Sequence, residues 1–372
     1  MLIGVPKEIK TDEYRVGLIP STVRELIRGG HKVEVETLAG EGAGIGDSEY
    51  TAAGARVVPT ADEIFQRAEL IVKVKEPLTI ERRKLRRGQI LFTYLHLAPD
   101  LEQTNDLMAS GVTAIAYETV TDAAGRLPLL APMSIVAGRM APQVAAHFLE
   151  RPHGGRGILL GGTGGVPSAK VVILGGGVVG AHAAEVALGM GGEVTIATRS
   201  AGTVCRLLQK FGGGINAVAA QPAEVESLCK SADVLVGAAL IAGATAPKLV
   251  SASTVRAMKP GAVIVDIAID QGGCIETSHP TTHSQPSFVI DGVIHYCVPN
   301  MPGAVPRTST FALSSATRPF ICALADKGFP RALIEDIHLQ NGLNIHAGKI
   351  TCRAVADALR LPYTRAADML GS

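Results

Sequence analysis

The hydrophobic positions of the chain fall into short apolar runs that alternate with longer amphipathic segments. In the first third this pattern predicts strands at 2–5, 32–36, 70–74, 90–96 and 113–118. It predicts helices at 21–28, 61–68 and 100–110, with Ser21 as the residue that caps the first of them. Short strands that alternate with helices are typical of βαβ units, so we expect a parallel sheet here.

The middle of the chain changes in composition before the alternation resumes. Residues 133–151 have helical periodicity with an expected kink at Pro142, and residues 151–170 are rich in Gly and Pro, as in a hinge. A second α/β unit begins at Lys170. Its predicted strands lie at 171–174, 193–198, 234–237, 262–269 and 292–296, with a helix up to Met190 after the first. From Thr308 onward we expect helices.

Composition and charge narrow the class of protein. A chain of 372 residues is long enough for two to three domains, at about 150 residues per domain. The hydrophobic fraction of 47% excludes a disordered chain, and 4% aromatic residues without Trp predict an aliphatic core, which suits parallel strands buried on both faces. The net charge of +1 argues against nucleic acid or an anionic membrane as the main partner.

Targeting segments, membrane spans and metal-binding cysteine motifs are not expected. The start MLIGVPKEIK resembles neither a signal nor a transit peptide, and the most apolar stretch, 171–192, contains His182, Glu185 and seven glycines. The six cysteines lie more than twenty residues apart and form no CxxC or CxxH pair, so we expect no metal site and no disulfides. These features predict a cytoplasmic protein.

A glycine pattern follows the first strand of the second unit. Gly175, Gly177 and Gly180 form G-x-G-x-x-G directly after an apolar strand and at the start of a helix. In this context the first glycine permits a tight turn, the second lets the backbone approach a pyrophosphate, and the third allows close packing of helix and strand. The pattern predicts a dinucleotide site at a helix N-terminus. The alternative is a turn that is merely rich in glycine.

The next strand ends in Thr198, Arg199 and Ser200, where an NAD-binding protein usually has a carboxylate for the ribose hydroxyls. An arginine between two hydroxyl groups suits a 2′-phosphate, because its planar fork donates hydrogen bonds and repels no anion. This triplet therefore favours NADP. The alternative is that Arg199 is only a solvated loop charge.

Polar residues also interrupt or follow other apolar runs. Asp266 and Asp270 lie in the run AVIVDIAIDQGG, with Asp270 at its carboxyl end, and His96 ends the run LFTYLHL. Ligands of open α/β sheets bind outside the carboxyl ends of strands, so His96 and Asp270 are candidates for an acid/base pair. Taken alone, His96 is better explained as a core histidine, and Arg15 and Lys75 are most simply explained as solvated charges.

At these residues the sequence resembles the alanine dehydrogenase family across essentially its whole length. The segments that carry the resemblance occur in order along the chain: GVPKEIKTDEYRVGLIP, VKVKEP, GQILFTYLHLA, AIAYETV, LLAPMSIVAGRMA, VVILGGGVVG, APKLVS, MKPGAVIVDIAIDQGGCIET, HYCVPN and NMPGAVPRTSTFAL. The resemblance implies two Rossmann-like doubly wound domains. A dinucleotide-binding domain (131–304) is inserted into a discontinuous catalytic domain (1–130 and 305–372). It also implies a hexamer that uses NAD.

The resemblance assigns roles residue by residue. Arg15 and Lys75 match the pair that binds pyruvate or alanine, and His96 and Asp270 match the catalytic acid/base residues. With the residues singled out above, the expected cofactor contacts are Ser134, Gly175, Gly177, Val178, Val179, Gly180, Thr198, Arg199, Ser200, Ala239, Leu240, Ile267, Asp270, Val298, Asn300 and Met301.

The sequence departs from the family pattern at several positions, and several of them are expected near the adenosine end of the cofactor. Thr198 stands where the family has Asp, Thr203 where it often has Lys, and His279 where it often has Arg. Ile135 stands where the family has a carboxylate. Thr163 and Gly164 change the family's usual segment GGVPGVP to GGTGGVP. Because an Asp at 198 would repel a 2′-phosphate and Thr198 does not, we expect NADP(H) to be accepted and preferred, with NAD(H) still usable.

Three functions fit these features. The first is an amino-acid dehydrogenase that converts L-alanine, NAD(P)⁺ and water to pyruvate, ammonium and NAD(P)H. The second is a transhydrogenase-like nucleotide-binding subunit, which need not retain Arg15, Lys75, His96 and Asp270. The third is a non-catalytic homologue or a relative that reduces another imine. We also expect a homo-oligomer, because an apolar, nearly neutral chain would expose apolar patches as a monomer.

Overall fold

The computed structural model describes residues 1–239 and 246–371. The chain divides into two compact units, the first made of Met1–Met133 with Gly303–Ser372 and the second of Ser134–Pro302. Helix α6 (Ala131–Phe148) begins in the first unit and contains Pro142 in its interior. That the first unit is catalytic and the second binds a dinucleotide remains a prediction, because compactness does not show what a unit binds.

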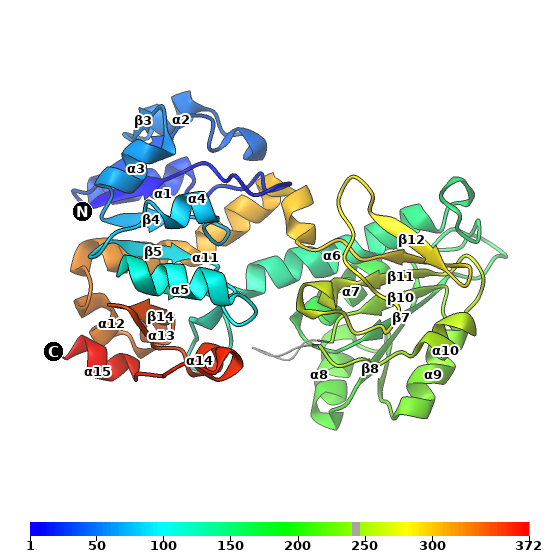
Figure 1. Cartoon of the computed structure of the whole chain (residues 1–372). Helices are drawn as coiled ribbons and strands as arrows, with labels where there is room; N and C mark the ends of the chain where they lie inside the picture. The colour runs from blue at the N-terminus through cyan, green and yellow to red at the C-terminus, as the bar shows by residue number, and fades with distance from the viewer. Residues whose placement is uncertain (240–245, 372) are drawn as a thin grey trace. The chain divides into compact units, whose positions relative to one another are not determined.

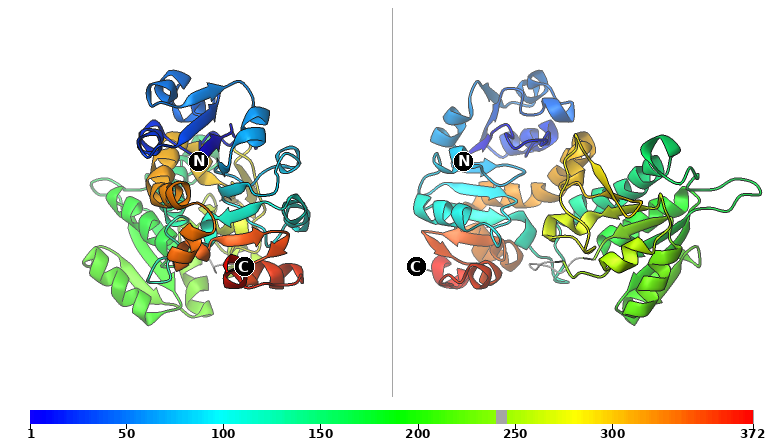
Figure 2. Two further views of the ribbon diagram at one scale, coloured as in Figure 1. Left: turned by 90° about the vertical axis from the view of Figure 1, so that its left-hand side faces the viewer. Right: turned by 45° about the vertical axis from the view of Figure 1, so that its right-hand side comes forward.

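The first unit is built on an eight-stranded sheet of order β15-β14-β6-β5-β4-β1-β2-β3 (Figure 1). Its strands are β1 (Leu2–Val5), β2 (Lys32–Glu36), β3 (Arg56–Val58), β4 (Leu70–Val72), β5 (Ile90–Thr93), β6 (Thr113–Ala116), β14 (Leu343–His346) and β15 (Lys349–Ile350). Strands β1 to β6 pair in parallel, whereas β14 is antiparallel to both β6 and β15. Figure 2 shows the orange and red C-terminal segment beside the cyan strands of the same unit.

Both faces of this sheet are buried, as the apolar strands predict. Side chains alternate between faces along a strand, so Leu70 and Val72 join one core cluster and Ile71 joins another. The helices of the unit are α1 (Pro20–Arg28), α2 (Asp47–Ala52), α3 (Ala61–Arg67), α4 (Thr79–Arg82), α5 (Leu101–Ser110), α11 (Pro306–Lys327), α12 (Arg331–Glu335), α13 (Ile337–Gln340), α14 (Arg353–Leu359) and α15 (Ala366–Leu370), with 3₁₀ turns η1 (Glu41–Ala43) and η2 (Tyr117–Thr119).

The second unit is built on a seven-stranded sheet of order β12-β13-β11-β10-β7-β8-β9. Its strands are β7 (Lys170–Leu174), β8 (Glu193–Thr198), β9 (Asn216–Ala219), β10 (Val234–Gly237), β11 (Val263–Asp266), β12 (Ser287–Ile290) and β13 (Val293–Tyr296). All pair in parallel except β12, which is antiparallel to β13. The helices are α7 (Val178–Gly189), α8 (Ala201–Phe211), α9 (Pro222–Ser231) and α10 (Ala252–Arg256), with 3₁₀ turns η3 (Arg151–His153), η4 (Ile267–Gln271) and η5 (Met301–Ala304), the last of which runs into the first unit.

Each sheet reverses its strand order at one place. In the first unit β2 and β3 lie on one side of β1 while β4, the next strand along the chain, lies on the other. In the second unit β8 and β9 lie on one side of β7 while β10 lies on the other. Such reversals open a crevice at the carboxyl ends of the two central strands, where open α/β sheets bind ligands. The predicted fold class, two doubly wound α/β domains, is confirmed.

Several predicted element boundaries are wrong. Helix α1 begins at Pro20 with Ile19 as its cap, so Ser21 lies inside the helix; the fixed φ of proline suits the first helical position. The strands predicted at 90–96, 113–118 and 262–269 end at Thr93, Ala116 and Asp266, where the chain leaves the sheet. The C-terminal part contains the hairpin β14–β15 as well as helices.

No helix within residues 1–239 and 246–371 combines the length and apolar character needed to cross a membrane.

Candidate active site

Three of the four residues predicted for substrate and catalysis follow neighbouring strands of the first sheet. Arg15 lies on the segment after β1, Lys75 lies three residues after β4, and His96 lies three residues after β5. Because β1, β4 and β5 are parallel neighbours, their carboxyl ends meet at one edge of the sheet, at the reversal between β1 and β4. The fold therefore brings these three residues to the same edge.

Arg15 is buried, with 2% of its surface exposed, and it is held by Glu13. Its Nε donates to Glu13 Oε1 at 2.6 Å, its Nη2 donates to Glu13 Oε2, and its Nη1 lies 2.9 Å from Met133 Sδ. Burial opposes the positive charge, but the hydrogen bonds and charge of Glu13 outweigh it and raise the pKa of Arg15. Sequence reasoning singled out Arg15 but missed Glu13, whose carboxylate binds Nε and Nη2 of the Arg15 guanidinium.

The backbone before Lys75 is fixed by Glu8, another residue that sequence reasoning missed. Glu8 Oε1 accepts the N–H of Val74 at 2.7 Å and, more weakly, that of Lys75 at 3.3 Å, while Oε2 accepts from Lys73 Nζ at 3.1 Å. Lys73 is fully buried and also donates to Glu81 at 2.7 Å. Burial raises the pKa of Glu8, with Lys73 opposing the shift. This buried network sets the direction in which the chain leaves β4.

Lys75 and His96 both lower the pKa of the Glu76 carboxyl. Burial favours the neutral form of Glu76, but Lys75, Lys10 and His96 outweigh it and lower the pKa of this carboxyl. The Nζ of Lys10 donates directly to Glu76 Oε1. Since electrostatic effects of this kind fall off with distance, the charges of Lys75 and His96 both reach the carboxylate of Glu76.

His96 has an uncommon backbone conformation. Its φ of +50° lies in the left-handed region that non-glycine residues rarely adopt, and its side chain is exposed. Glu118, which follows β6, accepts the N–H of His96 at 2.6 Å and that of Leu95 at 3.2 Å. The imidazole stacks on the buried ring of Tyr94, with centroids 5.8 Å apart and planes 8° apart. These contacts define where the ring of His96 lies.

A cavity of about 370 Å³ opens beside Arg15 in the first unit. Its lining residues are Lys7, Glu8, Ile9, Lys10, Asp12, Glu13, Tyr14, Arg15, Leu38, Ala39, Glu41 and Gly42. A volume of this size exceeds what a three-carbon acid needs. The wall contains three cations, Lys7, Lys10 and Arg15, and four carboxyl groups, those of Glu8, Asp12, Glu13 and Glu41. Because the carboxyl groups outnumber the cations, the candidate partner for a small anion is Arg15 itself and not the charge of the cavity as a whole.

In the second unit, the glycine-rich turn has the backbone that each predicted glycine role requires. Gly175 has a φ of +113°, and a Cβ on it would lie 2.5 Å from the carbonyl oxygen of Ala238, just beyond β10. A Cβ on Gly177 would meet nothing within 4 Å, which leaves room for a ligand. A Cβ on Gly180 would lie 1.9 Å from the carbonyl oxygen of Gly175, so helix and turn pack too closely for any side chain. The turn lies at the reversal between β7 and β10.

The Thr198 triplet lies beside this turn. Thr198 ends β8, and its Cβ lies 3.6 Å from the position that a Cβ on Gly176 would take. Arg199 is exposed, and Ser200 caps α8 by accepting the N–H of Thr203 at 3.3 Å. Sequence reasoning missed Arg206, whose Nη2 donates to the carbonyl oxygen of Gly176 at 3.0 Å. The only sequence signal for Arg206 was its place two helical turns after Arg199.

Asp270 lies on the 3₁₀ turn η4 and not at a strand end, so that part of the prediction is wrong. Its side chain is exposed, and its Oδ1 accepts the N–H of Asn300 at 3.2 Å. Asn300 has a φ of +57°. Asp266, by contrast, is buried and accepts the N–H groups of Cys274 and Ile275, so its role is to hold the loop after η4.

The remaining predicted cofactor residues belong to the second unit. Val178 and Val179 begin α7, Ser134 lies near the start of α6, Ala239 follows β10, and Ile267 begins η4. The side chains of Val298 and Met301 are buried in the core, so only their backbone groups are available to a ligand. Leu240 lies outside the described residues.

No metal site is predicted from the sequence, yet the structure brings three potential ligands together outside the candidate active site. These are His147, Glu150 and His153, whose ligand atoms all lie within 4.8 Å of one another.

Two doubly wound units define the general class of protein. One carries cations and a histidine at the carboxyl edge of its sheet, and the other carries a glycine-rich turn where its strand order reverses. This combination is typical of α/β enzymes that use a dinucleotide cofactor. The chain belongs to the alanine dehydrogenase/PNT family, whose N-terminal domain matches residues 4–137 and whose C-terminal domain matches residues 141–353.

Individual relatives agree with this assignment. The chain is 54% identical over 371 residues to the alanine dehydrogenase of Halomonas elongata and 49% identical over 370 residues to that of Mycobacterium tuberculosis, each covering 100% of both chains. A solved structure of L-alanine dehydrogenase superposes with a TM-score of 0.93 at 52% identity, covering 97% of this chain and 99% of that one. The transhydrogenase of Sinorhizobium meliloti gives a TM-score of 0.83 at 25% identity, covering 94% and 100%. The family predicted from the sequence is confirmed.

Proposed function

We propose that this protein is an alanine dehydrogenase, an oxidoreductase that reversibly deaminates L-alanine to pyruvate and ammonium with a nicotinamide dinucleotide. The proposal rests on the sequence identity of this chain to alanine dehydrogenases, which is 54% and 49% over the full length for two of them. The placement of Arg15, Lys75 and His96 at one sheet edge supports it. The transhydrogenase alternative is disfavoured, because that structure shares 25% identity with this chain, against 52% for L-alanine dehydrogenase.

Arg15 is the proposed partner of the substrate carboxylate. Glu13 binds its Nε and Nη2, and its Nη1 donates to Met133 Sδ at 2.9 Å, so the substrate carboxylate would meet a guanidinium that these contacts already orient. The ion pair with Glu13 keeps the guanidinium charged and rigid in a buried place, which favours a charge-assisted contact with a small anion. Lys75 is assigned to the carbonyl oxygen of pyruvate, where a cation stabilises developing negative charge.

His96 and Asp270 are the proposed acid/base residues. His96 is assigned to exchange a proton with the oxygen of the carbinolamine, because an imidazole nitrogen can both donate and accept a proton and the ring is exposed for contact. Asp270 is assigned to hold ammonium or water, because its carboxylate is exposed and is anchored by the N–H of Asn300. When bound, the nicotinamide supplies the hydride chemistry.

The residues of the glycine-rich turn fit a dinucleotide. Open space at Gly177 and the N-terminus of the twelve-residue helix α7 suit a pyrophosphate, which backbone N–H groups and the helix dipole would bind. For the adenosine end we propose a preference for NADP(H). Thr198 carries no charge that would repel a 2′-phosphate, and Arg199 and Arg206 supply two cations near the end of β8.

We also propose a homo-oligomer, with a hexamer as the family resemblance implies, in the cytoplasm. Large apolar side chains are exposed on the segment before β7, with Leu159 at 68% and Val166 at 57%. All six cysteines are free, which fits a reducing compartment. Sedimentation of the protein at micromolar concentration tests the assembly, and a species of monomer size alone would contradict it.

Initial rates with pyruvate and ammonium, measured with NADH and with NADPH side by side, test the proposed function. We expect oxidation of the reduced cofactor that requires both pyruvate and ammonium. Reduced cofactor that is consumed without ammonium, or hydride exchange between two dinucleotides without pyruvate, would contradict a dehydrogenase that acts on alanine.

A further inference from the structure

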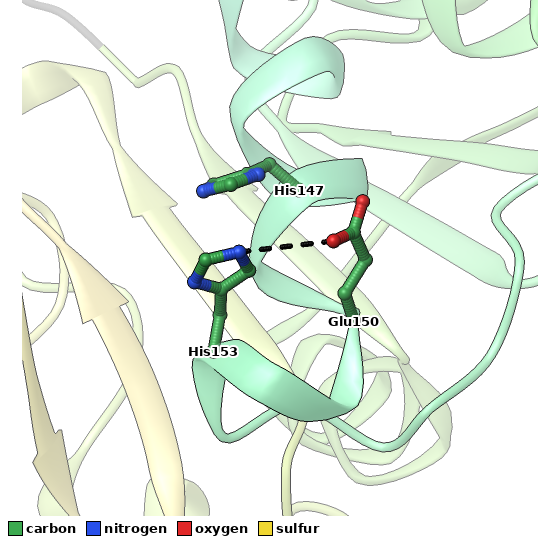
Figure 3. Close-up of side chains that lie close together, drawn as sticks. All are labelled: His147, Glu150 and His153. Carbon is green, nitrogen blue, oxygen red and sulfur yellow. Dashed lines mark ion pairs between the residues drawn. The ribbon is translucent and has the colours of Figure 1, made fainter.

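Two histidines and a glutamate meet on the surface of the second unit, where α6 ends (Figure 3). His147 lies in the last turn of α6, Glu150 follows the helix, and His153 ends η3. The Nε2 of His153 lies 3.7 Å from Glu150 Oε2, and the imidazole centroids of the two histidines lie 3.8 Å apart. None of the three residues is proposed to bind substrate or dinucleotide.

The backbone, and not helical periodicity, brings His153 to His147. On a continuous helix a residue six positions away would point about 240° around the axis, away from its partner. Here the chain turns back: Gly155 donates its N–H to the carbonyl oxygen of Glu150 at 3.1 Å, and Gly154 has a φ of +87°. A Cβ on Gly155 would lie 2.2 Å from the carbonyl oxygen of Phe148, so this turn admits no side chain there.

The ring of Phe148 limits how far the two imidazoles can move. Its centroid lies 5.3 Å from that of His147 and 6.0 Å from that of His153, and it is itself packed against Tyr296 at 5.9 Å. Tyr296 belongs to the core strand β13. Side chains that are held near each other before a ligand arrives lose less conformational entropy when it binds.

We propose that His147, Glu150 and His153 bind one divalent transition-metal ion of the zinc type. Two imidazole nitrogens and one carboxylate oxygen are a ligand set that zinc takes at about 2.0–2.2 Å, with a fourth position left to water. Ligand atoms that lie within 4.8 Å of one another reach such distances by small side-chain rotations, which exposed side chains allow. Calcium and magnesium are disfavoured because they prefer oxygen ligands alone.

A bound ion would join the last turn of α6 to η3. The segment after η3 leads to β7 and the glycine-rich turn, so the ion would fasten the chain just before the dinucleotide-binding strand. This inference does not depend on the proposed catalytic function, because no residue of the cluster takes part in it.

Calorimetric titration of ZnCl₂ into the EDTA-treated, buffer-exchanged protein at pH 7.5 tests the site. The titration uses a Cys205→Ser background, because Cys205 is an exposed thiol that can bind zinc by itself. We expect saturable binding of one ion per chain. His147→Ala and His153→Ala should each weaken it at least tenfold, and Glu150→Gln should weaken it less. His279→Ala, which removes another exposed histidine, should leave it unchanged.

Cobalt(II) provides a second readout of the ligand set. With nitrogen and oxygen ligands we expect visible d–d bands without a thiolate-to-cobalt charge-transfer band, and His153→Ala should abolish the bands. Zinc binding that survives both histidine substitutions, no saturable binding at all, or a thiolate band in the cobalt spectrum would overturn the proposal.

Discussion

The carboxylate of Glu118 accepts the backbone N–H of His96 at 2.6 Å, at a residue whose φ is +50°. A left-handed conformation at a non-glycine residue costs about 1–3 kcal/mol and persists only where surrounding contacts enforce it. Glu118 follows the neighbouring strand β6, so the two ends of β5 and β6 are joined through this carboxylate. Glu118 is therefore a positioning residue for the imidazole proposed as the acid/base group.

Replacing Glu118 tests this positioning. Glu118→Ala should lower kcat about tenfold or more, because the loss of charge-assisted hydrogen bonds of ~1.5–3 kcal/mol lets His96 leave its conformation. Glu118→Gln keeps one acceptor and should recover part of kcat, and the KM for the dinucleotide should stay near the parental value in both. Steady-state rates measure these effects.

Glu102→Ala, which removes an exposed carboxylate paired with Arg82, is the control and should change neither kcat nor KM. Equal losses of kcat in Glu118→Ala and in this control would contradict the prediction.

Removal of the proposed acid/base groups should separate chemistry from cofactor binding. His96→Ala and Asp270→Asn are each expected to lower kcat by about 10²–10⁴-fold, the usual contribution of general acid–base catalysis. Dinucleotide binding should persist, because the glycine-rich turn does not depend on either side chain. Cofactor titration by fluorescence together with kcat checks both parts. A variant with near-parental kcat would remove that residue from the mechanism.

The ion pair of Arg15 with Glu13 predicts two different defects. Arg15→Ala should raise the KM for pyruvate about tenfold or more, since a charge-assisted contact contributes ~1.5–3 kcal/mol. Glu13→Gln should have a smaller effect on KM but should destabilise the fold, because the buried guanidinium loses its counter-charge. Pyruvate saturation curves and thermal unfolding distinguish the two. An unchanged KM in Arg15→Ala would exclude the carboxylate assignment.

Glu76 should make stability depend on acid pH. Its pKa in the folded protein is lowered, with Lys75, Lys10 and His96 outweighing burial. A carboxyl whose folded pKa lies below its unfolded value of 4.5 contributes stability that is fully present above that pH and is lost as the pH falls below it. Glu76→Gln should therefore have a lower Tm than the parent at pH 7, and the difference should shrink below pH 4.5. A constant difference across this range would contradict the sign of the shift.

Most of the fold could be predicted from the sequence, because buried parallel strands are nearly continuous apolar runs. The strands that were missed are short or half exposed, such as β9 and the antiparallel hairpin β14–β15, where that signal is weak. The charged residues of the site were found only where a motif marked them. Glu13 and Glu118 act through contacts that tertiary folding creates, and Arg206 reaches Gly176 only because α8 packs back on the glycine-rich turn. His153 joins His147 for the same kind of reason.

Cofactor selectivity can be assigned to particular residues by a matched set of variants. Arg199 and Arg206 lie near the end of β8, where Thr198 takes the place of a carboxylate, and Arg206 is held by the carbonyl oxygen of Gly176 at 3.0 Å. Arg199→Ala and Arg206→Ala should each lower kcat/KM for NADPH about tenfold, because each removes a charge-assisted contact to phosphate of ~1.5–3 kcal/mol. The same constant for NADH should change little, and Arg256→Ala, an exposed arginine paired with Asp291, should change neither.

Thr198→Asp provides the complementary test, since it adds the charge that the chain lacks. A carboxylate at the end of β8 would accept hydrogen bonds from the ribose hydroxyls and repel a 2′-phosphate, so this variant should favour NADH. The comparison requires kcat/KM for both cofactors in the parent and in all four variants. If the parent strongly prefers NADH and Arg199→Ala and Arg206→Ala leave that preference unchanged, both arginines are solvated surface charges. The absence of an acidic residue at 198 would then have no bearing on the choice of cofactor.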